Sequence, residues 1–117
     1  MSSLQEVPSY DIENLTGVVL SGGQFKLNWS YPIDSPGVKP SGFNIYVKSS
    51  GDWSQIGMVY ARTRIRYYSY TTASFSEGTY MFRVFPYRGD LEYLSGKTVT
   101  LAASCAGPEI SDWILNY

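Results

Sequence analysis

The residues of this sequence best suited to recognition chemistry are the run Arg88-Gly89-Asp90. In a tight turn, such a run holds out an Asp carboxylate that can bind a metal ion carried by a receptor. The Arg side chain offers five hydrogen-bond donors on a long stem and can reach an acidic pocket. The same residues also make an ordinary turn, because Gly and Asp are favoured in turns for conformational reasons alone. Both interpretations stay open at the level of sequence.

Residue types needed for most catalytic and metal sites are missing. The sequence contains no histidine and a single cysteine, Cys105. These counts exclude Ser-His-Asp and Cys-His catalysis, histidine-based zinc sites and a disulfide within the chain. The acidic residues lie mostly in expected turns or near the ends, and no pair stands out as a general acid and base. We therefore expect no enzyme activity, no catalytic residue, no cofactor and no metal site.

The charge balance excludes two further classes of partner. Nine basic and ten acidic residues give a net charge of −1, whereas a general nucleic-acid binder needs a basic face. The same balance gives no reason for attraction to anionic membranes, and no apolar run approaches the roughly 20 residues of a membrane helix. Residues 1–8 lack the basic and apolar regions of a signal peptide. We expect a chain made without a secretion signal, or one cut from a longer protein.

Alternating hydrophobic residues identify the elements that would position a binding site. In residues 24–30, Phe25, Leu27 and Trp29 alternate with polar residues, which is typical of a half-buried strand. Gly and Pro residues separate this run from other strand-like segments. The expected strands are residues 15–20, 24–30, 42–47, 53–60, 64–72, 80–85 and 97–101.

This pattern predicts one all-β domain, a seven-stranded antiparallel β-sandwich, over residues 12–101. Residues 1–11 are polar, contain a proline and are expected to be a leader with little order of its own. Residues 102–117 are expected to be a short C-terminal extension beyond the last strand.

Four segments, in this order and spacing, resemble the fibronectin type III family. Residues 25–29 resemble the second strand of that family, with Trp29 as its core tryptophan, and residues 42–47 resemble the third strand. Residues 75–84 resemble the turn and sixth strand, and residues 89–101 resemble the last turn and strand. The resemblance implies that the Tyr80 hydroxyl bonds back to upstream backbone. It implies a fold more than a function, because this fold hosts many roles.

The resemblance also places Arg88-Gly89-Asp90 in the loop before the last strand. An integrin-binding member of the family carries its own Arg-Gly-Asp in that loop. Leu91 and Leu94 resemble the Leu-x-x-Leu extension of some integrin ligands.

A second candidate surface is the outward face of the third and sixth expected strands. Successive side chains of a strand point to opposite faces of its sheet. If the alternating hydrophobic side chains in segments 43–47 and 80–84 point inward, the side chains between them and those that follow at the same spacing point outward. Aromatic residues with an arginine are typical of interface cores, although ordinary cross-strand pairing on a solvated sheet gives the same pattern. The outward residues are Tyr46, Met81, Arg83, Phe85 and Tyr87.

A third candidate is the basic row Arg62, Arg64 and Arg66, which shares one face if it lies in a strand. These arginines, beside the tyrosines of residues 67–70, suit an acidic partner or a glycan. Alternatively, they guard a solvated sheet edge against pairing.

A fourth candidate is the C-terminal extension, which carries apolar residues at the spacing of a helix face. Such a short segment docks on a partner or folds back over its own domain, and we expect a docking element. Its apolar residues are Ile110, Trp113, Ile114 and Tyr117.

The function favoured by these features is a non-enzymatic structural and binding module of a larger assembly. We expect a bacteriophage virion component of the tail or capsid surface, acting through contacts with protein subunits of the same or a different kind. The first alternative is an adhesion module of a secreted or surface protein, which would bind a cell-surface receptor through Arg-Gly-Asp. The second alternative is a carbohydrate-binding accessory domain that binds a glycan. The place of action is then the virion, the extracellular space or the cell surface.

Overall fold

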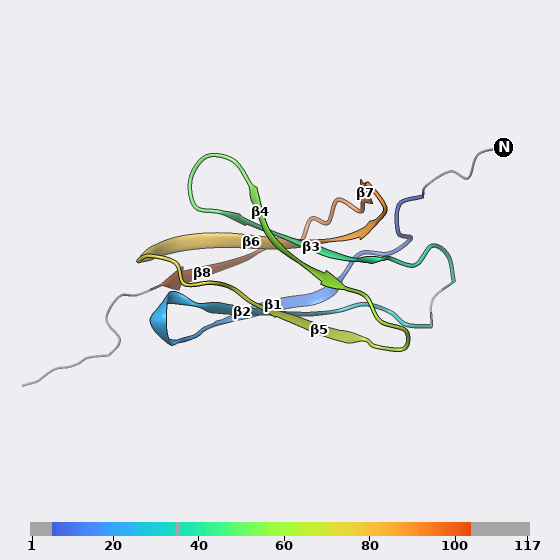
Figure 1. The fold of residues 1–117 in the computed structure, drawn as a ribbon, viewed down its shortest axis with the longest axis horizontal. Helices are drawn as coiled ribbons and strands as arrows, with labels where there is room; N and C mark the ends of the chain where they lie inside the picture. The colour runs from blue at the N-terminus through green and yellow to red at the C-terminus, as the bar shows by residue number, and fades with distance from the viewer. Residues whose placement is uncertain (1–5, 35, 104–117) are drawn as a thin grey trace, which may run out of the picture.

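A computed structural model describes residues 6–34 and 36–103 of the 117-residue chain. These residues form two antiparallel sheets that pack face to face, so the all-β prediction is confirmed (Figure 1). The smaller sheet has the order β1-β2-β5, and a 3₁₀ turn, Ser21–Gly23, joins its first two strands. Its strands are β1 (Glu13–Val19), β2 (Phe25–Ser30) and β5 (Tyr67–Thr71).

The larger sheet has the order β4-β3-β6-β7, and β8 also pairs with β6. The described part of the chain therefore has eight strands, and the expectation of seven is wrong. The additional strand is β7, which pairs with the end of β6 because the chain reverses direction at Gly89. The strands are β3 (Gly42–Lys48), β4 (Ser54–Tyr60), β6 (Gly78–Arg88), β7 (Leu91–Glu92) and β8 (Val99–Ala103).

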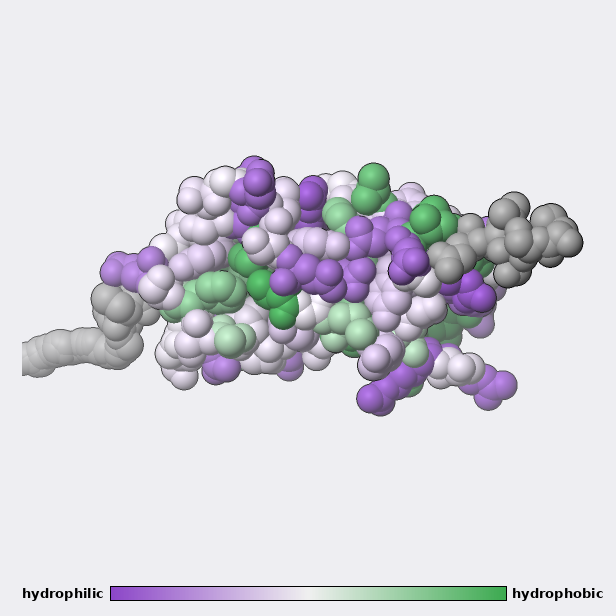
Figure 2. Space-filling model, turned by 45° about the horizontal axis from the view of Figure 1, so that its top comes forward, coloured by the Kyte–Doolittle hydropathy of each residue, from purple (hydrophilic) through white to green (hydrophobic). Residues whose placement is uncertain are grey.

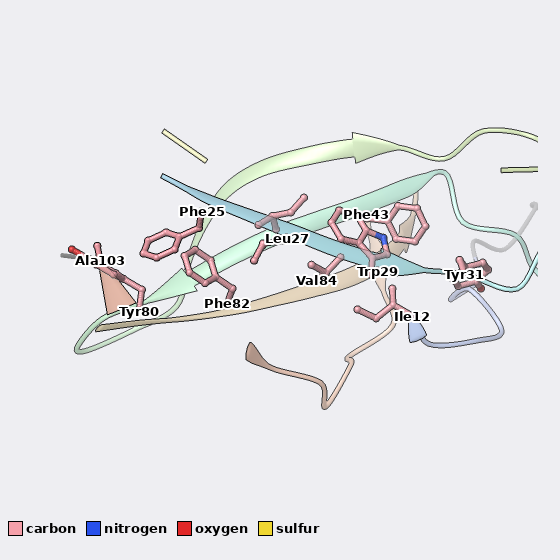
Figure 3. Close-up of a cluster of buried hydrophobic side chains, with 11 residues drawn as sticks. Ile12, Phe25, Leu27, Trp29, Tyr31, Phe43, Tyr80, Phe82, Val84 and Ala103 are labelled. Carbon is pink, nitrogen blue, oxygen red and sulfur yellow. The ribbon is translucent and has the colours of Figure 1, made fainter. Parts of the chain in front are cut away.

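The core lies between the sheets and is built from the inward residues of β2, β3 and β6 (Figure 3). Trp29 is 2% exposed, and its ring meets Phe43 edge-on with the ring centroids 5.6 Å apart. Burying each such side chain contributes about 1.5–3 kcal/mol, so these strands carry most of the cohesion between the sheets. The fully buried core side chains from these three strands are Phe25, Leu27, Phe43, Ile45, Phe82 and Val84.

Two tyrosine hydroxyls tie the strands to backbone elsewhere. The Tyr80 hydroxyl donates to the carbonyl of Ser76 over 2.9 Å, so the expected bond back to upstream backbone is present. The Tyr70 hydroxyl donates to the carbonyl of Ile56 over 3.0 Å, which links β5 of one sheet to β4 of the other. Both tyrosines pack against the core while their hydroxyls stay hydrogen-bonded.

Residues 8–12 are attached to the sandwich, although we expected residues 1–11 to have little order of their own. Pro8 and Ile12 are fully buried. Ser9 exchanges two hydrogen bonds with Val38: its amide donates to the Val38 carbonyl over 3.1 Å, and its hydroxyl accepts from the Val38 amide over 2.8 Å. Asp11 forms an ion pair of 3.1 Å with Lys97. This segment therefore closes one end of the core.

Several connections gather at that same end of the molecule. The β2–β3 loop, the β4–β5 turn and the β6–β7 turn all lie there, with the described start of the chain beside them (Figure 1). Loops at one end of a rigid sandwich are favourable positions for binding residues. Two kinds of surface are therefore available, this loop end and the outer face of the larger sheet.

Candidate functional site

The outer face of the larger sheet combines aromatic side chains with one arginine. On β3 and β6, residues that pair across the strands alternate between core and solvent, so Tyr46 pairs with Arg83 and Asn44 with Phe85. On the other side of β3, Asn44 pairs with Met58 of β4. We define the outer face by its central residues, which are Asn44, Tyr46, Trp53, Met58, Tyr60, Arg83, Phe85 and Tyr87.

Arg83 lies at the centre of this outer face and is held by two aromatic rings. Its guanidinium carbon is 4.0 Å from the ring centroid of Trp53 and 4.9 Å from that of Phe85. Cation–π contacts of this kind contribute about 0.5–2 kcal/mol, depending on how far the pair is desolvated. The Nε atom of Arg83 is buried and has no hydrogen-bond partner among the described residues. The arginine is therefore fixed in place while part of its hydrogen-bonding capacity is unused.

Beside Arg83, a small polar network surrounds the carboxylate of Glu92. The same Oε2 atom accepts hydrogen bonds from the Tyr46 hydroxyl and, over 2.8 Å, from the Asn44 side-chain amide. Gln55 donates to the side-chain carbonyl of Asn44 over 3.1 Å, which extends the network to β4. Burial, followed by the hydrogen bond to Glu92, raises the pKa of Tyr46 to about 12. The network thus fixes the side chains around Arg83 and keeps Tyr46 neutral.

The exposure of the outer face is uneven. Phe85 is only 5% exposed although it points away from the core, because it packs under Tyr46, at 5.2 Å between ring centroids, and beneath Arg83. Toward β4, Tyr60 is 68% exposed and Met58 is 38% exposed. The side of the molecule drawn in Figure 2 shows strongly hydrophobic residues in small separate groups. An aromatic face of intermediate polarity suits a reversible protein contact.

Arg88-Gly89-Asp90 forms the exposed turn between β6 and β7. Arg88 pairs with Leu91, so Gly89 and Asp90 are the two turn residues, and Gly89 has the positive φ of 59° that its position requires. The guanidinium of Arg88 donates to the carbonyl of Lys39 over 3.1 Å, so this side chain lies against the β2–β3 loop. Leu94 is 75% exposed. The run is accessible, and its arginine is exposed while hydrogen-bonded to the β2–β3 loop.

The three arginines expected in a strand lie elsewhere. Arg62, Arg64 and Arg66 belong to the connection that precedes β5, so the expectation that they share one strand face is wrong. The physical reason is a tight turn in which Arg64 has a positive φ of 66°, a conformation that is incompatible with a strand. Arg62 and Arg64 line a cavity at the loop end, and Arg66 is not among its lining residues.

The apolar residues expected to form a docking element, Ile110, Trp113, Ile114 and Tyr117, lie outside the described residues, as does Cys105. Within residues 6–34 and 36–103, no group of three or more His, Cys, Asp or Glu residues is arranged to hold a metal ion. No helix in this described part is long and apolar enough to cross a membrane.

The prediction of the outward residues did not include Trp53, which contacts Arg83, or Glu92, which accepts the hydrogen bonds of Tyr46 and Asn44. Trp53 is the first residue of the expected strand 53–60, and a large aromatic residue at a strand end is a signal of a surface contact. Glu92 reaches the face only because β7 folds back along β6, and no periodic pattern marks a strand of two residues. No protein-family model matches this chain, and no curated protein matches it either.

Proposed function

We propose that the sandwich is of the fibronectin type III kind. Three strands in the order β1-β2-β5 face a sheet whose longer strands have the order β4, β3, β6 and β8, and both sheets are antiparallel. The buried Trp29 and the hydrogen bond from Tyr80 to Ser76 support the same assignment. This assignment concerns the fold, and the function must be argued from the surface.

We infer that the chain is a non-enzymatic structural and binding module that contacts another protein subunit through the outer face. The observation that carries this proposal is Arg83, whose guanidinium is fixed between Trp53 and Phe85 on a residue that is only partly buried. Arginine and tryptophan are the residue types most enriched at the energetic centres of interfaces. A partner carboxylate would accept charge-assisted hydrogen bonds from the terminal guanidinium nitrogens of Arg83, so we expect the partner to present Asp or Glu there.

The assembly that we propose is a bacteriophage virion, with the chain on its tail or capsid surface. The support is the family resemblance, because sandwiches of this kind occur in such proteins, together with an outer face suited to protein contacts. We also propose that the chain has no catalytic activity.

Site-directed photo-crosslinking tests the proposed interface. A photoreactive amino acid at Met58 lies on the outer face, and the same amino acid at Val18, 49% exposed on β1 of the other sheet, is the matched control. We expect one cross-linked species from Met58, formed in virions or in concentrated protein, with the attachment mapped next to an acidic residue. Equal labelling from Met58 and Val18 would contradict the interface.

Substitution of Arg83 tests whether this residue is the centre of the contact. We expect Arg83→Lys to weaken the cross-link from Met58, because lysine keeps the charge but cannot make two parallel hydrogen bonds to a carboxylate. The control is Lys26→Gln, which changes an exposed charge on the smaller sheet. If Arg83→Lys cross-links as well as the parent chain, the arginine is not the centre of the contact.

Receptor binding through Arg-Gly-Asp is the second candidate, favoured by the exposed, tight β6–β7 turn. It requires Arg88 to leave the Lys39 carbonyl, to which it is bonded over 3.1 Å. Attachment of integrin-bearing cells to the immobilised chain tests this function. Attachment that needs divalent metal and disappears in Asp90→Glu would favour it, and attachment unaffected by that change would exclude it.

A further inference from the structure

We propose that the loop end of the sandwich binds an acidic saccharide, a sugar that carries a carboxylate or sulfate group. A cavity of about 350 Å³ lies there between the β2–β3 loop and the β4–β5 turn. Its volume falls in the range of small-ligand sites, about 300–1,000 Å³. The lining residues that matter for this proposal are Tyr31, Asp34, Lys39, Arg62, Arg64 and Tyr68.

The charges around the cavity favour an anion. Arg62 and Arg64 line the cavity with two guanidinium groups, and Asp34 is the one carboxylate among its lining residues. Neither Arg62 nor Arg64 makes an ion pair with a carboxylate of the described residues. Unpaired guanidinium groups at the rim of a cavity bind carboxylate or sulfate oxygens with charge-assisted hydrogen bonds. Because the chain as a whole has a net charge of −1, we expect it to attract anions at this cavity and not over its whole surface.

The turn that carries the arginines is fixed before any ligand arrives. The Tyr68 hydroxyl accepts from the amide of Arg62 over 3.1 Å and lies 3.0 Å from the carbonyl of Ile65, to which it donates. The Ile65 amide closes the turn on the carbonyl of Arg62 over 3.3 Å. The ring of Tyr68 reaches the core, with its centroid 4.7 Å from that of Phe43. Rigid presentation of a binding group reduces the entropy lost on binding.

Arg64 occupies a position in this turn that normally belongs to glycine. Its φ of 66° places it in the left-handed region at the third residue of the turn, where an ordinary side chain costs about 1–2 kcal/mol. Strained backbone that is held by its surroundings occurs preferentially at functional sites. Arg64 lines the same cavity as Arg62, so the strained residue is part of the proposed site.

Exposed tyrosines beside the cavity favour a ligand that contains a sugar ring. A second hollow of about 310 Å³ shares Arg62 and Tyr68 with the first and is bordered by Tyr60 and Tyr67. These two tyrosines are 68% and 75% exposed. Their rings offer flat apolar faces to the C–H side of a sugar ring, and their hydroxyls can donate to and accept from sugar hydroxyls. Cations alone would suit any anion, whereas cations with exposed tyrosines suit an acidic sugar.

Nuclear magnetic resonance titration of the full chain is the direct test. The probes are glucuronic acid, a sulfated disaccharide, neutral glucose, inorganic sulfate and a glutamate oligopeptide. We expect saturable shifts of the amides in residues 61–69 with the two acidic sugars, and weaker shifts with glucose or inorganic sulfate. Shifts that are as large with glucose, or larger with the glutamate peptide, would overturn the proposal, and the latter would assign the site to acidic peptides.

Three charge-removing variants of the same turn make the test specific. We expect Arg62→Gln and Arg64→Gln each to weaken binding of the sulfated disaccharide about tenfold, the loss expected for one charge-assisted hydrogen bond. Arg66→Gln removes the same charge outside the cavity lining and should change the affinity less than twofold. Amide spectra of all three variants verify folding. Equal losses in all three variants would show only general attraction of an anion, and would contradict a built site.

Discussion

The hydroxyl of Tyr46 donates a hydrogen bond to the carboxylate of Glu92, which ties β3 to β7 across the intervening β6. Burial and this bond raise the pKa of Tyr46 from 10.0 to about 12. The folded protein therefore holds the hydroxyl proton more tightly than the unfolded chain does. The resulting stabilisation is fully present below about pH 10 and is lost as the pH rises toward 12.

Comparison with Tyr46→Phe measures this contribution. Other groups also titrate in alkali, so the quantity to follow is the difference in free energy of unfolding between the parent chain and the variant. We expect that difference to shrink between pH 10 and pH 12, and denaturant unfolding at several pH values measures it. A difference that stays constant across this range would mean that the Tyr46 hydroxyl is not held by Glu92.

Loss of the Tyr80 hydroxyl tests the closure of the turn before β6. Tyr80→Phe removes the 2.9 Å hydrogen bond to the Ser76 carbonyl and keeps the ring in the core. We expect a loss of about 0.5–1.5 kcal/mol in the free energy of unfolding. The matched control is Tyr67→Phe, in which the tyrosine is 75% exposed, and it should change stability by less than about 0.5 kcal/mol. Equal effects would show that the Tyr80 hydroxyl contributes nothing specific.

Gly57 allows Tyr70 of the smaller sheet to reach the larger one. A Cβ atom at residue 57 would overlap the Tyr70 hydroxyl and ring, which lie against β4 to bond the Ile56 carbonyl. We expect Gly57→Ala to lower the free energy of unfolding by about 1–3 kcal/mol, as overpacking does. Gly96→Ala is the control, because its Cβ would meet nothing within 4 Å. A neutral Gly57→Ala would show that Tyr70 can move away without loss.

The sequence predicted the core better than the sites. Trp29 and Phe43 could be assigned to the core because strict alternation leaves one face for burial, and both are buried. Phe85 was correctly placed on the outward face, but its burial could not be foreseen, since it depends on Tyr46 and Arg83 closing over it. Side chains that cover each other across strands leave no periodic signal.

The loop end was the least predictable region. The basic residues of 62–66 were recognised, but the strand was expected to begin at residue 64, because β-branched and aromatic residues favour strands. The turn depends on Tyr68, whose hydroxyl bonds to backbone on both sides of it. The ring of Tyr68 is in turn held by its tertiary contact with Phe43, and no local pattern in the sequence reports that contact. The short pairing of Glu92 in β7 likewise depends on the fold around it.

The left-handed backbone at Arg64 is expected to lower the free energy of unfolding relative to a glycine at the same position. Arg64→Gly relieves a left-handed conformation, and after the greater flexibility of glycine in the unfolded chain is subtracted we expect a gain of about 0.5–1 kcal/mol. Thr63→Gly, at the preceding residue without a positive φ, should instead lose about 0.5–1 kcal/mol. Denaturant midpoints of the two variants, with unchanged slopes, measure both effects. If Arg64→Gly loses as much as Thr63→Gly, the turn is not strained. A variant that gains stability and also loses affinity for the sulfated disaccharide would show that stability is exchanged for binding at this residue.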